Sequence, residues 1–306
     1  MRFRNSHVKR LTVAALFAAA CLVIAAVLLL NSDKFVQTAN EDSSAVLTAA
    51  SSCDDFVRFI DVGQGDCALI TSNGKSVLID TGTPEDSNNL CVKLRKYGIR
   101  DSIDAIMLSH FHDDHSGGID ALTSRFSVSN LIFPDMKKSD SVLNGTVTAK
   151  KTVLSEGGEL YIAKQGMTMK FGDCTVTILA YFADQESENE RSVFAMADMH
   201  GKRFLFTGDS GKSSEKLLLK EGLDLKCDVL KVGHHGSNSS SSDDFLEACN
   251  PEYASISCGL GNMYSHPGES TLSRLEKHGI KFYRTDLNGD ISFAVDENGI
   301  YPVTEK

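Results

Sequence analysis

The sequence predicts an α/β fold in which β-sheets form the centre and helices cover their outer faces. Short β-rich runs separated by turn signals come first in the chain, and apolar strands that alternate with helical segments come later. This succession is typical of sheets covered by helices. The composition agrees, because 42% apolar and 24% charged residues describe an ordinary folded chain and exclude a disordered, collagen-like or coiled-coil protein.

Strands are predicted from runs rich in β-branched and aromatic residues, and helices from apolar spacing with stop signals. Asn73-Gly74 is a strong hairpin turn, Gly98 ends a helix, and His200-Gly201 forms the turn of a second hairpin. In chain order, the expected elements are strands 56–60, 67–71 and 76–80, helix 89–97, strand 105–108, helix 117–126, strands 192–197 and 203–207, helix 213–220, strand 229–232, helix 242–249, strand 253–257 and helix 269–278.

Residues 11–30 form an apolar segment without any charged side chain. This length spans a bilayer of about 30 Å as one helix. Arg2, Arg4, Lys9 and Arg10 precede the segment, so the positive-inside bias predicts a cytoplasmic N-terminus and an extracytoplasmic remainder. A cleaved signal peptide is the alternative, although its apolar region is usually shorter.

The sequence therefore divides into four segments. Residues 1–10 are expected to be a cytoplasmic tail and residues 11–30 a transmembrane anchor or signal peptide. Residues 31–54, rich in Ser, Ala, Asn and Asp, are expected to be a linker. Residues 55–306 are expected to form the folded domain.

The charge of this domain limits its partners. Residues 1–30 hold four basic and no acidic residues, so the remainder has 27 basic and 41 acidic residues and a net charge of −14. Such a balance excludes a broad basic surface for duplex DNA. The seven cysteines beyond residue 30 include no CxxC pair, which argues against a zinc knuckle.

The strongest chemical signal is the segment 109–118, SHFHDDHSGG, directly after the predicted strand 105–108. His110, His112, Asp114 and His115 are potential metal ligands within six residues, and imidazole with carboxylate suits zinc, manganese or iron. A loop at a strand end can direct the first two histidines one way and the other two residues the opposite way. One loop can therefore serve two metal ions.

Two later positions extend this pattern. Asp209 ends the apolar strand before it, and His234 follows the strand 229–232. Together, H-x-H-x-D-H, T-G-D and G-H resemble the metallo-β-lactamase superfamily. The sharper resemblance, over residues 56–290, is to the hydrolase domain of bacterial competence DNA-uptake (ComEC-type) proteins, and it rests on the motifs DVGQGD at 61–66, LIDTG at 78–82, KVGHHGS at 231–237, SHP at 265–267 and YRTD at 283–286.

The resemblance implies an αββα sandwich, preceded here by the transmembrane helix, with a two-metal hydrolytic site at one edge. By position, His110 and His112 would bind the first metal. Asp114, His115 and His234 would bind the second, and Asp209 would bridge the two. Two divalent ions are expected as cofactors, with zinc as the expected metal and manganese as the alternative.

Three further residues are expected to support the metals or the substrate. Asp80 would hold the histidine loop by hydrogen bonds, and a strand-end turn cap is the alternative. His235 would face the substrate or cap the following turn. Ser237 opens the serine-rich run 237–242, whose hydroxyl and N–H groups suit a phosphate oxygen, and a flexible polar loop is the alternative.

One ligand that the superfamily usually supplies is missing, namely a third histidine for the first metal. His200 is the only histidine between His115 and Asp209, and it is expected at the surface roughly 20 Å from the metals, at about 3.3 Å per strand residue. Asn189 lies near the expected position instead. The first metal would therefore be held more openly.

These residues predict an extracytoplasmic hydrolase that uses a metal-bridged hydroxide, which serves phosphoesters and acyl bonds alike. A phosphodiesterase or nuclease is the first hypothesis, with Asp114 and His266 as catalytic residues. His266 would protonate the leaving oxygen or bind phosphate, and a capping role is the alternative. The other hypotheses are a lactamase-like or lactonase-like acyl hydrolase and a non-catalytic, metal-stabilised binding module.

The expected partners follow from the same segments. The substrate is a phosphodiester, either nucleic acid or a cell-wall polymer such as teichoic acid. The membrane is contacted through residues 11–30, so the expected location is the cell membrane, single-pass, with secretion as the alternative.

Overall fold

The computed structural model describes residues 50–137, 140, 142 and 144–306, of which Ser52–Lys306 form one compact unit. The predicted tail, the apolar segment 11–30 and nearly all of the predicted linker lie outside the described residues. Within the described part of the chain, no helix is long and apolar enough to cross a membrane.

The first β-sheet has the order β15-β14-β1-β2-β3-β4-β5-β6. Its strands from β3 to β6 are parallel, and the other neighbours are antiparallel. Its members are β1 (Asp55–Phe59), β2 (Ala68–Ser72), β3 (Lys75–Ile79), β4 (Ser102–Met107), β5 (Ser127–Phe133), β6 (Glu159–Ile162), β14 (Ile291–Val295) and β15 (Ile300–Thr304).

The second β-sheet has the order β13-β12-β11-β10-β9-β8-β7. Here the strands from β10 to β13 are parallel, whereas β7 to β10 form an antiparallel meander. Its members are β7 (Thr168–Phe171), β8 (Cys174–Ala180), β9 (Phe194–Met199), β10 (Lys202–Phe206), β11 (Val229–Lys231), β12 (Tyr253–Ile256) and β13 (Lys281–Arg284).

The two sheets pack face to face around one apolar core. Val57, Phe59 and Ile79 from the first sheet share this core with Phe204 and Phe206 from the second. Phe59 and Phe206 have ring centroids 5.9 Å apart. Burial of each such side chain stabilises the fold by about 1.5–3 kcal/mol, so this contact between the sheets is a main source of stability.

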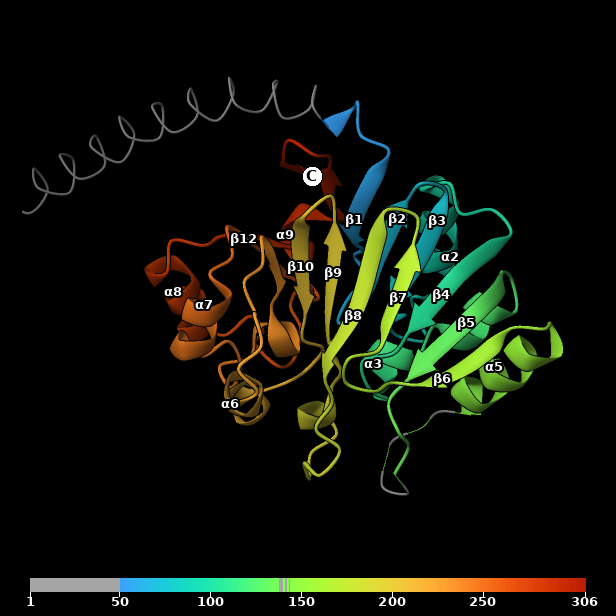
Figure 1. Cartoon of the computed structure of the whole chain (residues 1–306), viewed down its shortest axis with the longest axis horizontal. Coiled ribbons are helices and arrows are strands. Elements are labelled where there is room, and N and C mark those ends of the chain that lie inside the picture. Colours follow the sequence, from blue (N-terminus) through green and yellow to red (C-terminus); the bar gives the residue numbers. More distant parts are fainter. Residues whose placement is uncertain (1–49, 138–139, 141, 143) are drawn as a thin grey trace, which may run out of the picture. The chain divides into compact units, whose positions relative to one another are not determined.

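Helices cover the outer face of each sheet, as Figure 1 shows. Leu90 and Leu94 pack on the first sheet, and Leu218, Phe245 and Leu275 pack on the second. The helices are α2 (Ser87–Lys96), α3 (Asp113–Ser116), α4 (Ile119–Thr123) and α5 (Asn144–Ser155) on the side of the first sheet, α6 (Lys212–Lys220), α7 (Asp243–Cys249) and α8 (Glu269–Lys277) on the side of the second, and the short α9 (Thr285–Asn288) after β13. The four layers form the αββα sandwich that the sequence predicted.

The predicted elements that appear here agree with the observed ones to within a few residues at each end, and the Asn73-Gly74 turn is present. The helix predicted at 117–126 is present as the shorter α4, and the short helix α3 precedes it. Gly117 and Gly118 separate them, and a Cβ on Gly118 would lie 2.2 Å from the carbonyl oxygen of Thr81. The backbone at Gly118 passes so close to the end of β3 that a larger residue would not fit there, so α3 and α4 do not join into one helix.

Candidate metal centre

The candidate site lies where four strands end. Asp80 follows β3, the histidine loop follows β4, Asp209 follows β10, and His234-His235 follow β11. The strands come from both sheets, so the sandwich brings together side chains that are far apart in the sequence. This convergence at strand ends is where α/β proteins commonly bind ligands.

Asp80 anchors the histidine loop. Its carboxylate accepts hydrogen bonds from the Ser109 backbone N–H at 2.7 Å and from the Ser109 hydroxyl at 2.7 Å. It also lies 2.8 Å from Nδ1 of His115. Because Nδ1 of His115 faces a carboxylate, Nε2 is left for another partner. These contacts fit the supporting role expected for Asp80.

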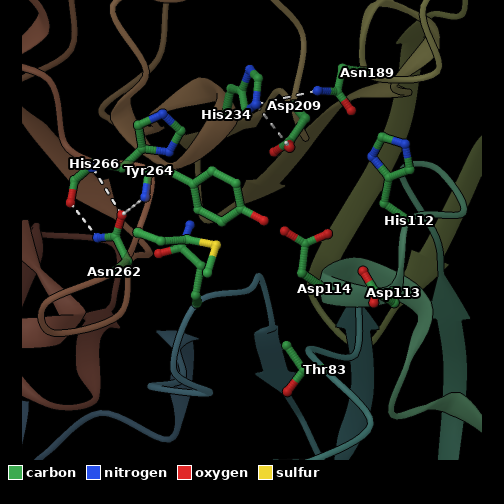
Figure 2. Close-up of a pocket in the computed structure, with 12 residues that line it drawn as sticks. Thr83, His112, Asp113, Asp114, Asn189, Asp209, His234, Asn262, Tyr264 and His266 are labelled. Carbon is green, nitrogen blue, oxygen red and sulfur yellow. Dashed lines mark hydrogen bonds and ion pairs between the residues drawn. The ribbon is translucent and has the colours of Figure 1, made fainter.

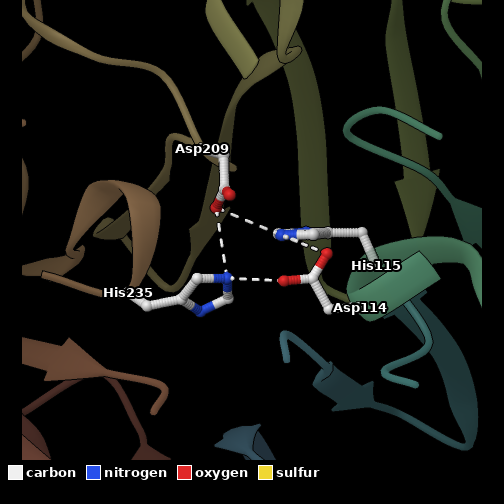
Figure 3. A group of neighbouring side chains, drawn as sticks. All are labelled: Asp114, His115, Asp209 and His235. Carbon is white, nitrogen blue, oxygen red and sulfur yellow. Dashed lines mark hydrogen bonds and ion pairs between the residues drawn. The ribbon is translucent and has the colours of Figure 1, made fainter. Parts of the chain in front are cut away.

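Four side chains form what we call the buried cluster, namely Asp114, His115, Asp209 and His235. One donor atom of each lies within 4.8 Å of the others. Nε2 of His115 lies 3.1 Å from Oδ1 of Asp209, and Nε2 of His235 lies 3.1 Å from Oδ2 of Asp114. Figure 3 shows the four side chains directed toward one another.

The hydrogen bonding of the buried cluster suits a cation. Nδ1 of His235 donates to the carbonyl oxygen of Ser257 at 3.0 Å, which leaves Nε2 facing the carboxylates. Nε2 of His115 and Oδ1 of Asp209 are buried and face each other at 3.1 Å, but neither makes a well-aligned hydrogen bond to any described residue. Two imidazoles and two carboxylates that converge in this way are a suitable ligand set for a divalent ion such as zinc or manganese.

The charges in the buried cluster also favour the binding of a cation. Burial alone would raise the pKa of Asp209, but His235 and His115 hold it well below its usual range. Burial alone would lower the pKa of His115, but Asp209, Asp80 and Asp114 raise it well above its usual value. The carboxylates therefore favour positive charge at their centre, as a metal site requires.

His110 and His112, which we call the histidine pair, form the second candidate ligand set. Nε2 of His110 and Nδ1 of His112 lie 3.1 Å apart. Two nitrogen ligands of one tetrahedral zinc ion would be separated by about 3.3 Å, given Zn–N distances of about 2.0–2.1 Å. Burial, and then His115, lower the pKa of His110 well below its usual value, so this ring is in the neutral form that binds metals.

Glu188 supports the histidine pair, and the sequence did not indicate it. Its Oε2 lies 3.6 Å from Nε2 of His112, and its Oε1 accepts a hydrogen bond from the Phe111 backbone N–H at 3.0 Å. A carboxylate behind a ligating imidazole is a common way to orient a metal ligand. The only local signal is its position one residue before Asn189.

The geometry favours His235 over His234 beside Asp114 and His115. Nε2 of His234 lies 3.7 Å from the other oxygen of Asp209 and 3.2 Å from the side-chain nitrogen of Asn189. Both histidines have positive φ angles, near 50°, so two successive residues lie in the left-handed region. Such strain is common at functional sites, and here it turns both rings toward the centre. The assignment of His234 as a ligand stays a prediction.

His200 lies outside the candidate site, in the turn between β9 and β10. The residue is exposed, as predicted, and its Nε2 lies 2.7 Å from a carboxylate oxygen of Asp55. This pair lies at the end of the sandwich where β1 begins, and His200 does not belong to the buried cluster.

A cavity of about 500 Å³ opens beside the candidate ligands, as Figure 2 shows. The residues around it come from the histidine loop, from the segments after β1, β3, β10, β11 and β12, and from the turn before β9. They are Gln64, Thr83, His112, Asp113, Asp114, Asn189, Asp209, His234, Asn262, Met263, Tyr264 and His266.

Ser237 is not among these lining residues, and its hydroxyl pairs with the Ser239 hydroxyl at 2.9 Å. Part of the run 237–242 already has an internal partner. Glu215 accepts hydrogen bonds from the Ser241 and Ser242 backbone N–H groups and from the Ser242 hydroxyl. Phosphate binding by Ser237 stays a prediction.

His266 does line the cavity, with its ring centroid 5.5 Å from that of His234. Its Nδ1 is buried and has no hydrogen-bond partner among the described residues. Burial, and then His234 and His235, lower the pKa of His266 below its ordinary value. His266 is therefore a neutral ring in the free protein, and it lines the space where a substrate would lie.

Comparison with known proteins is consistent with this geometry. Residues 60–135 match the model of the metallo-beta-lactamase superfamily. The chain is 31% identical to ComE operon protein 3 of Bacillus subtilis over 80% of its own length and 34% of that protein. It is 33% identical to competence protein ComA of Neisseria gonorrhoeae over 78% of its own length and 32% of that protein. The chain thus spans about a third of these relatives.

Solved structures agree on the fold. YhfI from Bacillus subtilis, a metallo-beta-lactamase fold protein, has a TM-score of 0.55 at 13% identity and covers 78% of this chain and 100% of its own. Igni18, a metallo hydrolase from Ignicoccus hospitalis, has a TM-score of 0.51 at 14% identity and covers 79% of this chain and 100% of its own. The family match over residues 60–135, the homology and the fold together identify a metallo-beta-lactamase superfamily domain in this chain, homologous to part of the competence proteins named above, and its donor residues suit metal ions.

Proposed function

We propose that the chain hydrolyses phosphodiesters with two divalent metal ions, zinc in the first instance and manganese as the alternative. The observation that carries the proposal is the position of His266, whose side chain lines the same cavity as Asp114 and Asp209. An alkoxide leaving group needs a proton donor on the side away from the attacking water, and a histidine suits that role. The similarity to competence proteins supports the same substrate class.

The buried cluster and the histidine pair would hold the metals. When bound, two divalent ions activate a water and neutralise the charge that develops on the attacked phosphate. Both carboxylates of the cluster line the cavity, and Asp114 is the more accessible one, since its side chain is 24% exposed and that of Asp209 only 3%. Asp114 is therefore placed to accept a proton from the attacking water.

The remaining lining residues would orient the phosphate. Asn189 donates toward Nε2 of His234 at 3.2 Å, and Oδ1 of Asn189 is buried and has no hydrogen-bond partner among the described residues. A phosphodiester anion near His266 would raise the pKa of that ring, because negative charge stabilises the imidazolium form. Substrate binding would thereby load the proton that the leaving oxygen needs.

Two variants test this proposal. His266→Ala should retain both metals and slow hydrolysis about 10²- to 10⁴-fold on a phosphodiester with a poor leaving group. It should have little effect on a p-nitrophenyl ester, whose leaving group needs no proton. His278→Ala is the matched control. His278 follows the C-terminal end of α8, its ring pairs with Asp243, and it does not line the cavity. Equal slowing on both substrates would reject the proton donor, and loss of metal would make His266 a ligand.

Assays on nitrocefin and a lactone test the acyl-hydrolase alternative. Metal binding without turnover of any ester would leave the non-catalytic binding module. Metal analysis by mass spectrometry, after purification without added metal, tests zinc against manganese.

We also propose that the catalytic domain is extracytoplasmic, anchored through residues 11–30 or secreted after their cleavage. The basic residues before this segment support the orientation. Protease added to intact cells should digest an anchored domain, and the culture medium should contain a secreted one. Full protection inside the cells would contradict the proposal.

A further inference from the structure

The loop between β12 and α8 exposes large apolar side chains beside the polar cavity. Leu260 is 81% exposed, Met263 is 87% exposed and Tyr264 is 61% exposed. Met263 and Tyr264 also line the cavity, whereas Leu260 does not. Exposed apolar side chains at the rim of a site usually mark a surface that a ligand covers.

This loop is held in place by hydrogen bonds. The Asn262 side chain donates to the carbonyl oxygens of Gly259 at 2.9 Å and His266 at 2.6 Å, and it accepts from the backbone N–H groups of Tyr264 and His266 at 3.2 and 3.0 Å. The Gly259 backbone N–H donates to the Gln64 side chain at 2.9 Å. The exposed side chains therefore sit on an ordered scaffold, which reduces the entropy lost when a ligand binds.

The ring of Tyr264 is prepared for stacking. It lies nearly parallel to the ring of His266, with an interplanar angle of 26° and centroids 5.8 Å apart. Figure 2 shows Tyr264 projecting into the cavity, on the side opposite His112 and Asn189. Because Tyr264 is 61% exposed, much of its ring is available for contact with a second flat group.

The charges around the cavity point to the same kind of ligand. Three aspartates, Asp113, Asp114 and Asp209, line it, and no lysine or arginine is among its described lining residues. Phosphate groups away from the metals would therefore find no cationic side chain there. Affinity for the rest of the substrate has to come from apolar and aromatic contact.

We propose that Met263 and Tyr264 form a subsite for a planar aromatic group attached next to the scissile phosphodiester, with Tyr264 as the specificity-determining residue. A nucleobase is such a group, so the subsite selects nucleotide phosphodiesters over polymers of glycerol phosphate or ribitol phosphate. This inference rests on the proposed phosphodiesterase activity. Stacking of bases on aromatic side chains is tolerant of base identity, so little preference among the bases is expected.

The test compares two diesters with the same leaving group, thymidine 5′-(4-nitrophenyl phosphate) and ethyl 4-nitrophenyl phosphate. The wild-type chain should prefer the thymidine ester. Tyr264→Leu should lower this preference in kcat/KM about 5- to 100-fold, mainly through KM, while kcat/KM for the ethyl ester stays the same. Tyr264→Phe should keep the preference, because the ring face remains. Leu260→Ala, in the same loop but outside the cavity lining, is the control and should match the wild type.

The outcomes separate the two proposals. Hydrolysis of neither ester by the metal-loaded wild type would reject the phosphodiesterase proposal itself. Hydrolysis of both esters without preference, or an unchanged preference in Tyr264→Leu, would overturn the subsite while the activity stands. Equal loss in Tyr264→Phe and Tyr264→Leu would also overturn it, since the ring face would then not be the contact.

Discussion

Replacement of Lys231 by methionine should destabilise the domain strongly, because it leaves a buried carboxylate without its counter-charge. Nζ of Lys231 lies 2.6 Å from Asp66, and the two side chains are only 4% and 5% exposed. Lys231 also donates to the carbonyl oxygen of Val232 at 2.9 Å. Methionine retains most of the side-chain volume, so the change mainly removes the charge.

The structure places this pair in the class of buried ion pairs, for which loss of one partner costs about 3–5 kcal/mol. For a domain of this size, about 2–4 °C in Tm accompanies each kcal/mol, so a fall of about 6–20 °C is expected. Urea unfolding in the presence of a chelator measures the free energy without a contribution from bound metal. Lys226→Met, an exposed lysine near β11, is the matched control and should change the free energy of unfolding by less than about 0.5 kcal/mol.

The effect should also depend on pH in a defined direction. Burial alone would raise the pKa of Asp66, but Lys231, and then His235 and His115, hold it well below its usual range. A carboxyl group whose pKa is lower in the folded than in the unfolded protein stabilises the fold when it is ionised. This contribution is present at pH values above the pKa of an Asp in the unfolded chain, about 3.9, and it is lost as the pH falls through the pKa of the folded state. Without Lys231 the pKa of Asp66 should rise, so the difference between wild type and variant should be larger at pH 7 than at pH 4.5.

A double variant completes the test. Asp66→Asn combined with Lys231→Met removes both charges and should recover part of the lost stability, because no charge is then left unpaired. Two results would refute the reasoning. One is a loss of less than about 1 kcal/mol in the free energy of unfolding of Lys231→Met. The other is a loss in the double variant that equals the sum of the losses in the two single variants.

Three further outcomes are expected. Asp209→Ala should lower the metal content, measured by mass spectrometry, to well below one ion per chain, because Asp209 contacts both His115 and His234. His200→Ala, whose ring pairs with Asp55 instead, should leave metal content and activity unchanged. Glu188→Gln should weaken metal binding at the histidine pair about 10- to 100-fold in a chelator competition, because Glu188 contacts His112. The control Glu186→Gln, at an exposed residue, should bind metal as the wild type does. Equal metal affinity of Glu188→Gln and the wild type would contradict a supporting role for Glu188. Burial lowers the pKa of Lys150 to about 8, and only the neutral amine reacts with acetic anhydride. The rate of acylation at Lys150, followed by mass spectrometry, should therefore level off above pH 8 while the rate at other lysines still rises. Rates that rise in parallel at Lys150 and at the other lysines would contradict this.

The features that the sequence determined by itself are local ones. The Asn73-Gly74 turn, the helix stop at Gly98 and the strands that end at the histidine loop depend on neighbouring residues, so short-range patterns reveal them. The potential ligands of the histidine loop lie within six residues, and any fold that places the loop at a strand end brings them together.

Other parts of the fold were not evident from local patterns. Strands β5, β6, β7 and β8 and helix α5 were not predicted, and neither were the later strands β13, β14 and β15. β6 and β15 are mostly half-exposed, so their apolar alternation is weak, and α5 buries only a few of its residues. Tertiary pairing with neighbouring strands, rather than intrinsic propensity, decides such elements.

The site itself depends on contacts between distant segments. Glu188 reaches the histidine loop across 77 residues, and Glu215 bonds to the end of the serine-rich run across 26. The choice between His234 and His235 depends on backbone angles that only the packed turn imposes, since a positive φ redirects each side chain. Sequence patterns report which residues can bind a metal, but the direction of a side chain and the identity of its distant partner are set by the packing of the whole sandwich.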